Sequence, residues 1–108
     1  MFDNDKRYIT KGVKYKIDDK LQLVLWELIE ILKDKAEESE SLSVDYLQVF
    51  NLHSEKSDDG QEFQQIVHTQ EKPEYENTIY VPFQNAIDEK LFAIDDESYI
   101  TLLLASEY

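Results

Sequence analysis

The sequence contains no cysteine, only two glycines and only two prolines. The absence of cysteine excludes disulfide bonds, thiolate metal sites and cysteine nucleophiles, and it is compatible with an intracellular protein. So few glycines leave no room for phosphate-binding loops or dinucleotide-binding fingerprints. No hydrophobic run approaches the roughly 20 residues of a membrane-spanning helix, and the first residues contain no apolar signal core. We therefore expect a soluble, cytoplasmic protein with no membrane partner.

Basic residues are scarce relative to acidic ones, and the formal net charge is −13. Residues 1–16 contain five bases and two acids, a net charge of +3, whereas the other 92 residues contain six bases and 22 acids, a net charge of −16. Such a field repels phosphate backbones and attracts basic protein surfaces. We predict a protein partner with a basic surface and no direct binding of nucleic acid.

What the sequence does contain is enough apolar material for a folded core. The chain has 108 residues, of which 42% are hydrophobic, including seven Tyr, five Phe and one Trp. A chain of this size commonly forms one domain without disulfide or metal cross-links. We expect a single domain over residues 1–108.

The hydrophobic pattern predicts one helix and several strands. Residues 18–35 form an amphipathic helix, with Asp18 or Asp19 as its N-cap and lysines in the last turn. Strands are predicted over residues 7–17 (bent or interrupted at Gly12), 44–54, 62–70, 77–83, 90–94 and 99–106, and a helix is the alternative for residues 97–106. Pro82 confines its strand to an edge or a terminus. The prediction is an α+β fold in which one amphipathic helix packs on a mostly antiparallel sheet of five or six strands.

The two histidines are the candidates for a metal or acid/base site. If Asp59 and Gly60 form a two-residue turn, Asn51 lies opposite His68 and His53 lies opposite Ile66, which places both histidines on one face. With Glu71 as a third ligand they would give a His/His/carboxylate site. The spacing matches no strong metal motif, so ordinary strand histidines are the simpler interpretation, and no cofactor and no catalytic residue are predicted.

The predicted helix has a second apolar patch opposite its core stripe. At about 100° per residue, Leu23, Trp26 and Glu30 lie together on the side away from Leu21, Leu25, Leu28 and Leu32. A large aromatic beside an aliphatic residue with an acidic rim resembles a protein-binding hot spot. The alternative is that the N-terminal segment or a loop covers Trp26.

Five stretches together resemble one known family. They are RYITKGV, LQLVLWELI, DYLQVFNL, IVHTQEKPEY and IDDESYITLLLASEY. They are similar to the small Gram-positive bacterial family called domain of unknown function 960, whose members also occur on mobile elements, and the resemblance covers most of residues 6–108. The acidic segment around Glu37 to Ser41 is longer than the family pattern. The resemblance implies a small α+β domain in a bacterial or phage setting and no assigned activity.

Taken together, these features favour an acidic, non-enzymatic protein-interaction module, an accessory or inhibitory protein of a mobile element that acts on a basic protein surface. Mimicry of DNA by the carboxylates is one form of this hypothesis. The alternative is a small metal-binding protein or enzyme that uses His53 and His68. A homodimer formed through the helix patch or an edge strand is a further interpretation.

Overall fold

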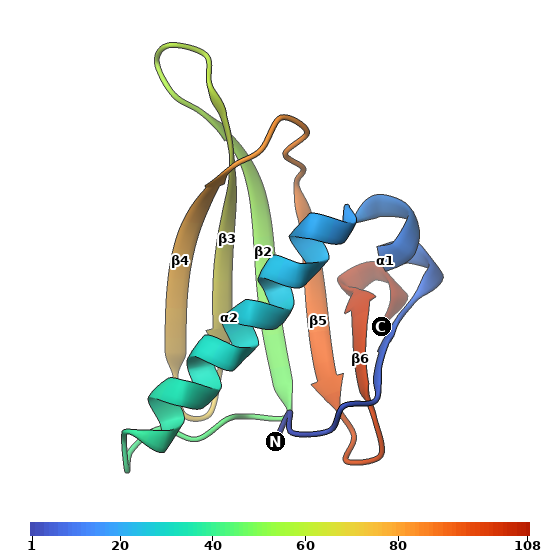
Figure 1. Cartoon of the computed structure of the whole chain (residues 1–108), viewed down its shortest axis with the longest axis vertical. Coiled ribbons are helices and arrows are strands. Elements are labelled where there is room, and N and C mark those ends of the chain that lie inside the picture. Colours follow the sequence, from blue (N-terminus) through green and yellow to red (C-terminus); the bar gives the residue numbers. More distant parts are fainter.

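A computed structural model describes all residues, 1–108, as one six-stranded sheet with helices on one face (Figure 1). The elements are β1 (Arg7–Ile9), α1 (Lys11–Lys16), α2 (Asp19–Glu37), β2 (Leu47–Lys56), β3 (Glu62–Gln70), β4 (Tyr75–Pro82), β5 (Glu89–Asp95), β6 (Ile100–Leu104) and the 3-10 turn η1 (Ala105–Glu107). The strand order is β1-β6-β5-β2-β3-β4, so β1 and β4 are the edges. None of the helices combines the length and apolar character needed to cross a bilayer.

The long helix α2 is the predicted one. Asp18 is its N-cap, and the side chain of Asp18 accepts a hydrogen bond from the Lys20 amide at 2.8 Å. Its buried stripe of Leu21, Leu25, Leu28 and Leu32 packs on the sheet. Figure 1 shows α2 crossing the sheet diagonally, from β5 at its N-terminal end to β4 at its C-terminal end.

The sheet is mixed, which corrects the expectation of a mostly antiparallel sheet. The short strand β1 pairs in parallel with β6, while β6, β5, β2, β3 and β4 pair with their neighbours in antiparallel fashion. A parallel pair joins segments from opposite ends of the chain, and no local sequence pattern reports it. Residues 97–106 contain the strand β6 rather than a helix.

The opening segment forms a strand of three residues and a short helix, whereas one bent strand was expected. Thr10 caps α1, and its hydroxyl accepts a hydrogen bond from the Val13 amide at 3.3 Å. Glu107 reinforces this cap from the other end of the chain, because its carboxylate accepts hydrogen bonds from the Thr10 hydroxyl at 2.6 Å and the Gly12 amide at 3.2 Å. A Cβ atom at Gly12 would lie 2.7 Å from that carboxylate. Gly12 therefore allows the Glu107 carboxylate to lie close to the backbone, and it does not interrupt a strand.

The β2–β3 register differs by one residue from the prediction, and this separates the histidines. The connection is a five-residue loop, closed by the Ser57 amide donating to the Gln61 carbonyl at 2.9 Å, with Gly60 at φ 86°. His53 consequently pairs with Gln65, and His68 pairs with Phe50. A shift of one residue reverses the face on which each side chain lies. His53 and His68 project from opposite faces of the sheet, so the prediction that they share one face is wrong.

The core lies between α2 and the sheet, and the other face of the sheet has no covering layer beyond Tyr108, whose ring packs against Phe92 with centroids 5.4 Å apart. Phe50, Leu52, Ile66 and Leu91 are buried on the helix side, together with Phe2 from the N-terminal segment. We call the opposite side the open face. It is defined by the alternate strand residues that point away from α2, with Leu47, Val49, Val67, Phe92, Ile94 and Leu103 at its centre.

Candidate interaction surface on the long helix

The outer face of α2 combines exposed apolar and acidic side chains. We define it as the residues of α2 that point away from the sheet: Asp19, Lys20, Leu23, Trp26, Glu27, Glu30, Ile31, Asp34 and Glu37. Leu23 is 65% exposed and Ile31 is 40% exposed. Isolated exposed leucines are common, but an exposed leucine between Asp19 and Glu27, on a face with one lysine, Lys20, has the composition of an interaction surface.

Trp26 is only partly accessible, because the N-terminal segment covers one side of it. The Arg7 guanidinium lies 4.9 Å from the centre of the indole ring, and the ring packs against the core. Arg7 also pairs with Glu30, at 2.8 Å between Nη2 and Oε1. The structure therefore brings Leu23, Trp26 and Glu30 to one face and adds Arg7, which the sequence-based interpretation did not identify.

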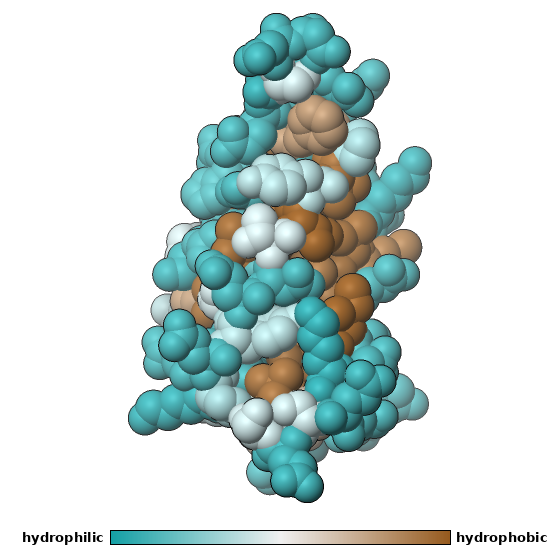
Figure 2. All heavy atoms as spheres, turned by 90° about the vertical axis from the view of Figure 1, so that its left-hand side faces the viewer, coloured by the Kyte–Doolittle hydropathy of each residue, from teal (hydrophilic) through white to brown (hydrophobic).

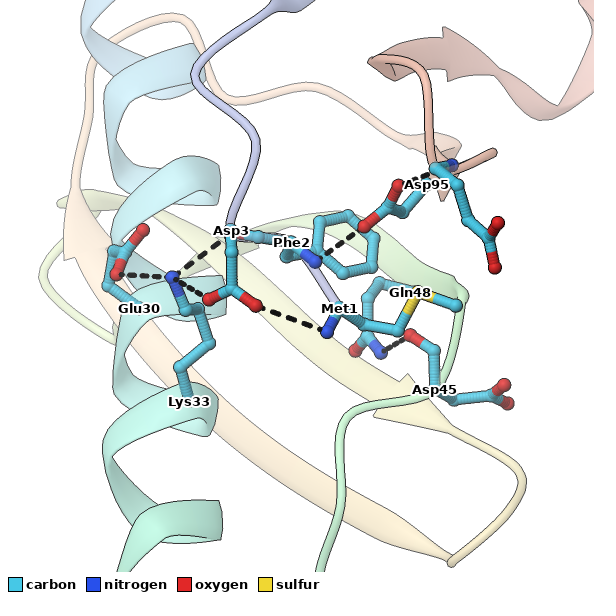
Figure 3. Close-up of polar contacts among 9 residues, drawn as sticks. Met1, Phe2, Asp3, Glu30, Lys33, Asp45, Gln48 and Asp95 are labelled. Carbon is cyan, nitrogen blue, oxygen red and sulfur yellow. Dashed lines mark hydrogen bonds and ion pairs between the residues drawn. The ribbon is translucent and has the colours of Figure 1, made fainter.

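Lys33 anchors the N-terminal segment beside this face (Figure 3). Its ammonium group donates to the Phe2 carbonyl and pairs with the Asp3 carboxylate, both at 3.1 Å, and it lies 3.6 Å from Glu30. The Phe2 amide donates to the buried carboxylate of Asp95. The hydrogen bond from Lys33, aided by the N-terminal amino group, holds the pKa of Asp3 below its usual value. These contacts hold the segment that covers Trp26 in place.

Apolar side chains also reach the surface where α2 borders the edge strand β4. Figure 2 views the molecule from the β4 edge and shows hydrophobic residues gathered along its middle, between hydrophilic ends. Ile79, Val81 and Phe83 are half-buried in and beside β4. Ile31 lies on the opposite flank of α2 from Trp26, since five residues correspond to about 140° around the helix. The apolar part of the outer face therefore extends on both sides of Leu23.

His68 lies in a buried polar row beneath α2. Gln48, Gln64, His68 and Gln70 are all buried, on the helix side of β2 and β3. The Gln48 amide nitrogen donates to the Asp45 carbonyl at 2.9 Å and to the Gln70 side-chain oxygen at 2.8 Å. The Gln48 oxygen must then accept from His68 Nε2, which lies 2.7 Å away. This arrangement assigns the proton of the imidazole to Nε2.

The remaining nitrogen of His68, Nδ1, has no hydrogen-bond partner. The ring stacks on Phe50, with centroids 4.7 Å apart, and meets the edge of Tyr75 at 5.5 Å. Burial lowers the pKa of His68 to about 4, and the nearby Lys35 contributes to the lowering. A neutral, buried imidazole of this kind acts as a packing group and as a hydrogen-bond donor.

The residues of the alternative metal site are not brought together. His53 is exposed on the open face, His68 is buried on the helix side, and Glu71 lies in the turn after β3. No group of three or more His, Asp or Glu side chains lies close enough to hold a metal ion.

Comparisons with known proteins agree with the fold and add no activity. Residues 6–107 match the family described as "Staphylococcal protein of unknown function (DUF960)". The structure is similar to the crystal structure of a protein of unknown function from Enterococcus faecalis, with a TM-score of 0.76 and 25% sequence identity over 99% of this chain and 94% of that chain. No curated protein matches the sequence. Because the family model spans almost the whole chain, the chain belongs to the domain of unknown function 960 family.

Proposed function

We propose that this protein is an acidic, non-enzymatic interaction module that binds a basic protein surface through the outer face of α2. The observation that supports it best is the exposure of Leu23 within a row of carboxylates on one side of the helix. An exposed apolar side chain supplies affinity when the partner removes it from water. Acidic residues on the same face attract a basic partner and fix its orientation.

The spacing of the acids on α2 supports the more specific proposal of DNA mimicry. Glu27, Glu30, Asp34 and Glu37 lie within one sector of the helix. At 1.5 Å per residue they span about 15 Å of helix axis, a length in which one strand of a DNA duplex places about four phosphates. Because Glu30 is already paired with Arg7 and Lys33, a basic cleft that binds DNA would meet three unpaired carboxylates in this length. In this proposal the protein acts in the cytoplasm as an accessory or inhibitor encoded by a mobile element.

The experiment is affinity capture from lysate of a Gram-positive host at low salt, with matched variants. Glu27→Lys combined with Asp34→Lys reverses two charges on the outer face of α2. Asp58→Lys combined with Glu76→Lys, exposed in the β2–β3 loop and on β4, makes the same change of four charge units away from α2 and is the control. We expect the double variant to lose at least tenfold in affinity for the captured partner, equivalent to about 1.4 kcal/mol, and the control to bind normally.

Leu23→Ala tests the apolar contact separately from the charge. Because Leu23 is mostly exposed, its truncation should change the free energy of unfolding by no more than about 0.5 kcal/mol. Trp26→Ala is a poorer probe, since the indole ring packs against the core. Capture of no partner at low salt, or equal binding by Leu23→Ala and the wild type, would contradict the proposal. If duplex DNA displaced this protein from the captured partner, the result would favour DNA mimicry over a general electrostatic attraction between acidic and basic surfaces.

A further inference from the structure

The open face of the sheet is more apolar than a solvent-facing sheet surface requires. An antiparallel sheet with one wet face normally shows polar residues at every second position of its strands. In β2 both faces carry apolar residues, with Leu47 and Val49 on the open face and Phe50 and Leu52 in the core. The same holds in β5, where Phe92 and Ile94 lie on the open face.

These side chains form one continuous patch across the central strands. Val49 pairs with Phe92 of β5, and Phe92 in turn pairs with Leu103 of β6. Leu47 pairs with Ile94 in the adjacent row. Leu103 is buried and the other side chains are half-buried, and the ring of Tyr108 packs against Phe92 with centroids 5.4 Å apart. The outer surfaces of Leu47, Val49 and Ile94 remain available to a further layer.

The open face also lacks charge, in contrast to the rest of the molecule. Among the strand residues that point away from α2, only Glu55, Glu76 and Lys90 are charged, a net charge of −1. The whole chain has a net charge of −13. A partner recognised through the acidic character of this protein would meet almost none of its carboxylates here. The occupant of this face must instead offer a neutral, apolar surface.

We infer that this occupant is a second copy of the chain, packed open face to open face about a twofold axis. An isologous contact places the same patch on both sides, so a face that is nearly neutral avoids opposing like charges. Five strand spacings of about 4.8 Å and a strand length of about 25 Å give about 600 Å² per protomer and about 1,200 Å² in total, within the range of stable interfaces. The product is a two-sheet sandwich with a helical layer on each outside.

This dimer leaves the outer face of α2 free on both protomers. The helix and the open face lie on opposite sides of the sheet, so neither surface hinders the other (Figure 1). A dimer would also present two acidic helices to a partner that has paired basic sites. The inference is independent of the proposed function, because it depends on a different surface.

Sedimentation equilibrium over a hundredfold range of concentration tests the inference. We expect the wild type to sediment as a dimer and Val49→Lys, which places a charge at the centre of the patch, to weaken the association at least tenfold. Val67→Lys, on the neighbouring strand, is the second variant and covers the case in which the first does not fold. Circular dichroism establishes the folded state of each.

The matched control is Leu23→Lys, which introduces the same charge at an exposed apolar residue on the opposite side of the molecule. It should sediment as the wild type does. A wild type that stays monomeric throughout the concentration range would overturn the inference. So would a dimer that survives Val49→Lys and Val67→Lys, or one that Leu23→Lys dissociates, because the contact would then lie elsewhere.

Discussion

At the scale of single residues, the clearest consequence of the structure concerns His68. Its imidazole is buried and neutral, and its pKa falls from 6.5 to about 4 on folding. The unfolded chain therefore binds a proton at a higher pH than the folded protein does. The stability that depends on a neutral His68 is fully present above pH 6.5 and is lost as the pH falls towards 4. The loss amounts to about 3 kcal/mol, from 1.36 kcal/mol for each pKa unit.

His68→Gln should remove this part of the acid sensitivity, because glutamine does not titrate and its amide can still donate to Gln48. The measurement is the free energy of unfolding by urea at a series of pH values between 7 and 4. We expect the variant to have a shallower pH dependence than the wild type. His53→Gln is the control, since His53 is exposed on the other face. Identical pH profiles for His68→Gln and the wild type would show that the buried imidazole does not control acid unfolding.

At the scale of elements, one buried glutamine positions the connection between β4 and β5. The Gln64 side chain accepts a hydrogen bond from the Ile87 amide and donates one to the Ile87 carbonyl, both at 2.9 Å. Gln64→Leu retains the volume of the side chain but leaves both groups of Ile87 without these partners. We expect a loss of about 2–3 kcal/mol in the free energy of unfolding and faster hydrogen exchange at the Ile87 amide.

Gln65→Leu is the matched control for this prediction. Gln65 is the next residue of β3, is only half-buried, and makes one side-chain bond, to the Tyr80 hydroxyl at 2.9 Å. Its replacement should cost less than about 1 kcal/mol. Equal losses for the two variants would mean that the bonds to Ile87 contribute little.

Elements determined by local patterns were predictable, and those determined by distant contacts were not. The stripe of Leu21, Leu25 and Leu28 indicates α2 directly, and Pro82 lies at the end of the edge strand β4, as predicted. The β2–β3 register was missed because the loop has five residues, and no pattern in the flanking strands reveals its length. The position of Arg7 over Trp26 depends on the pairing of β1 with β6, which joins segments far apart in the sequence. Of the candidate site, the grouping of Leu23, Trp26 and Glu30 was therefore predictable, and cover of Trp26 by the N-terminal segment was one of the two predicted alternatives, but Arg7 as the covering residue was not predictable.

At the scale of the whole molecule, the two proposed associations should respond to salt in opposite directions. Binding of a basic partner by the outer face of α2 depends on attraction between opposite charges, so added salt weakens it. Dimerisation through the open face brings two chains of charge −13 together through apolar contacts, so salt screens the repulsion and strengthens it. The measurements are partner binding and sedimentation equilibrium, each at several sodium chloride concentrations. If added salt changed the affinity for the partner and the affinity of the dimer in the same direction, one of the two mechanisms would be wrong.

The parallel pairing of β1 with β6 also has a consequence during protein synthesis. Arg7 leaves the ribosome long before Ile100, the residue with which it pairs. Until then β1 has no neighbour in the sheet, Asp95 has not yet arrived to hold the Phe2 amide, and Glu107 is not present to cap α1. The nascent chain can form α2 and the β2–β3–β4 meander early, since these contacts are local. Until the last strand emerges, its first residues can contact only α2, through Lys33 and Glu30, and their pairing in the sheet forms last.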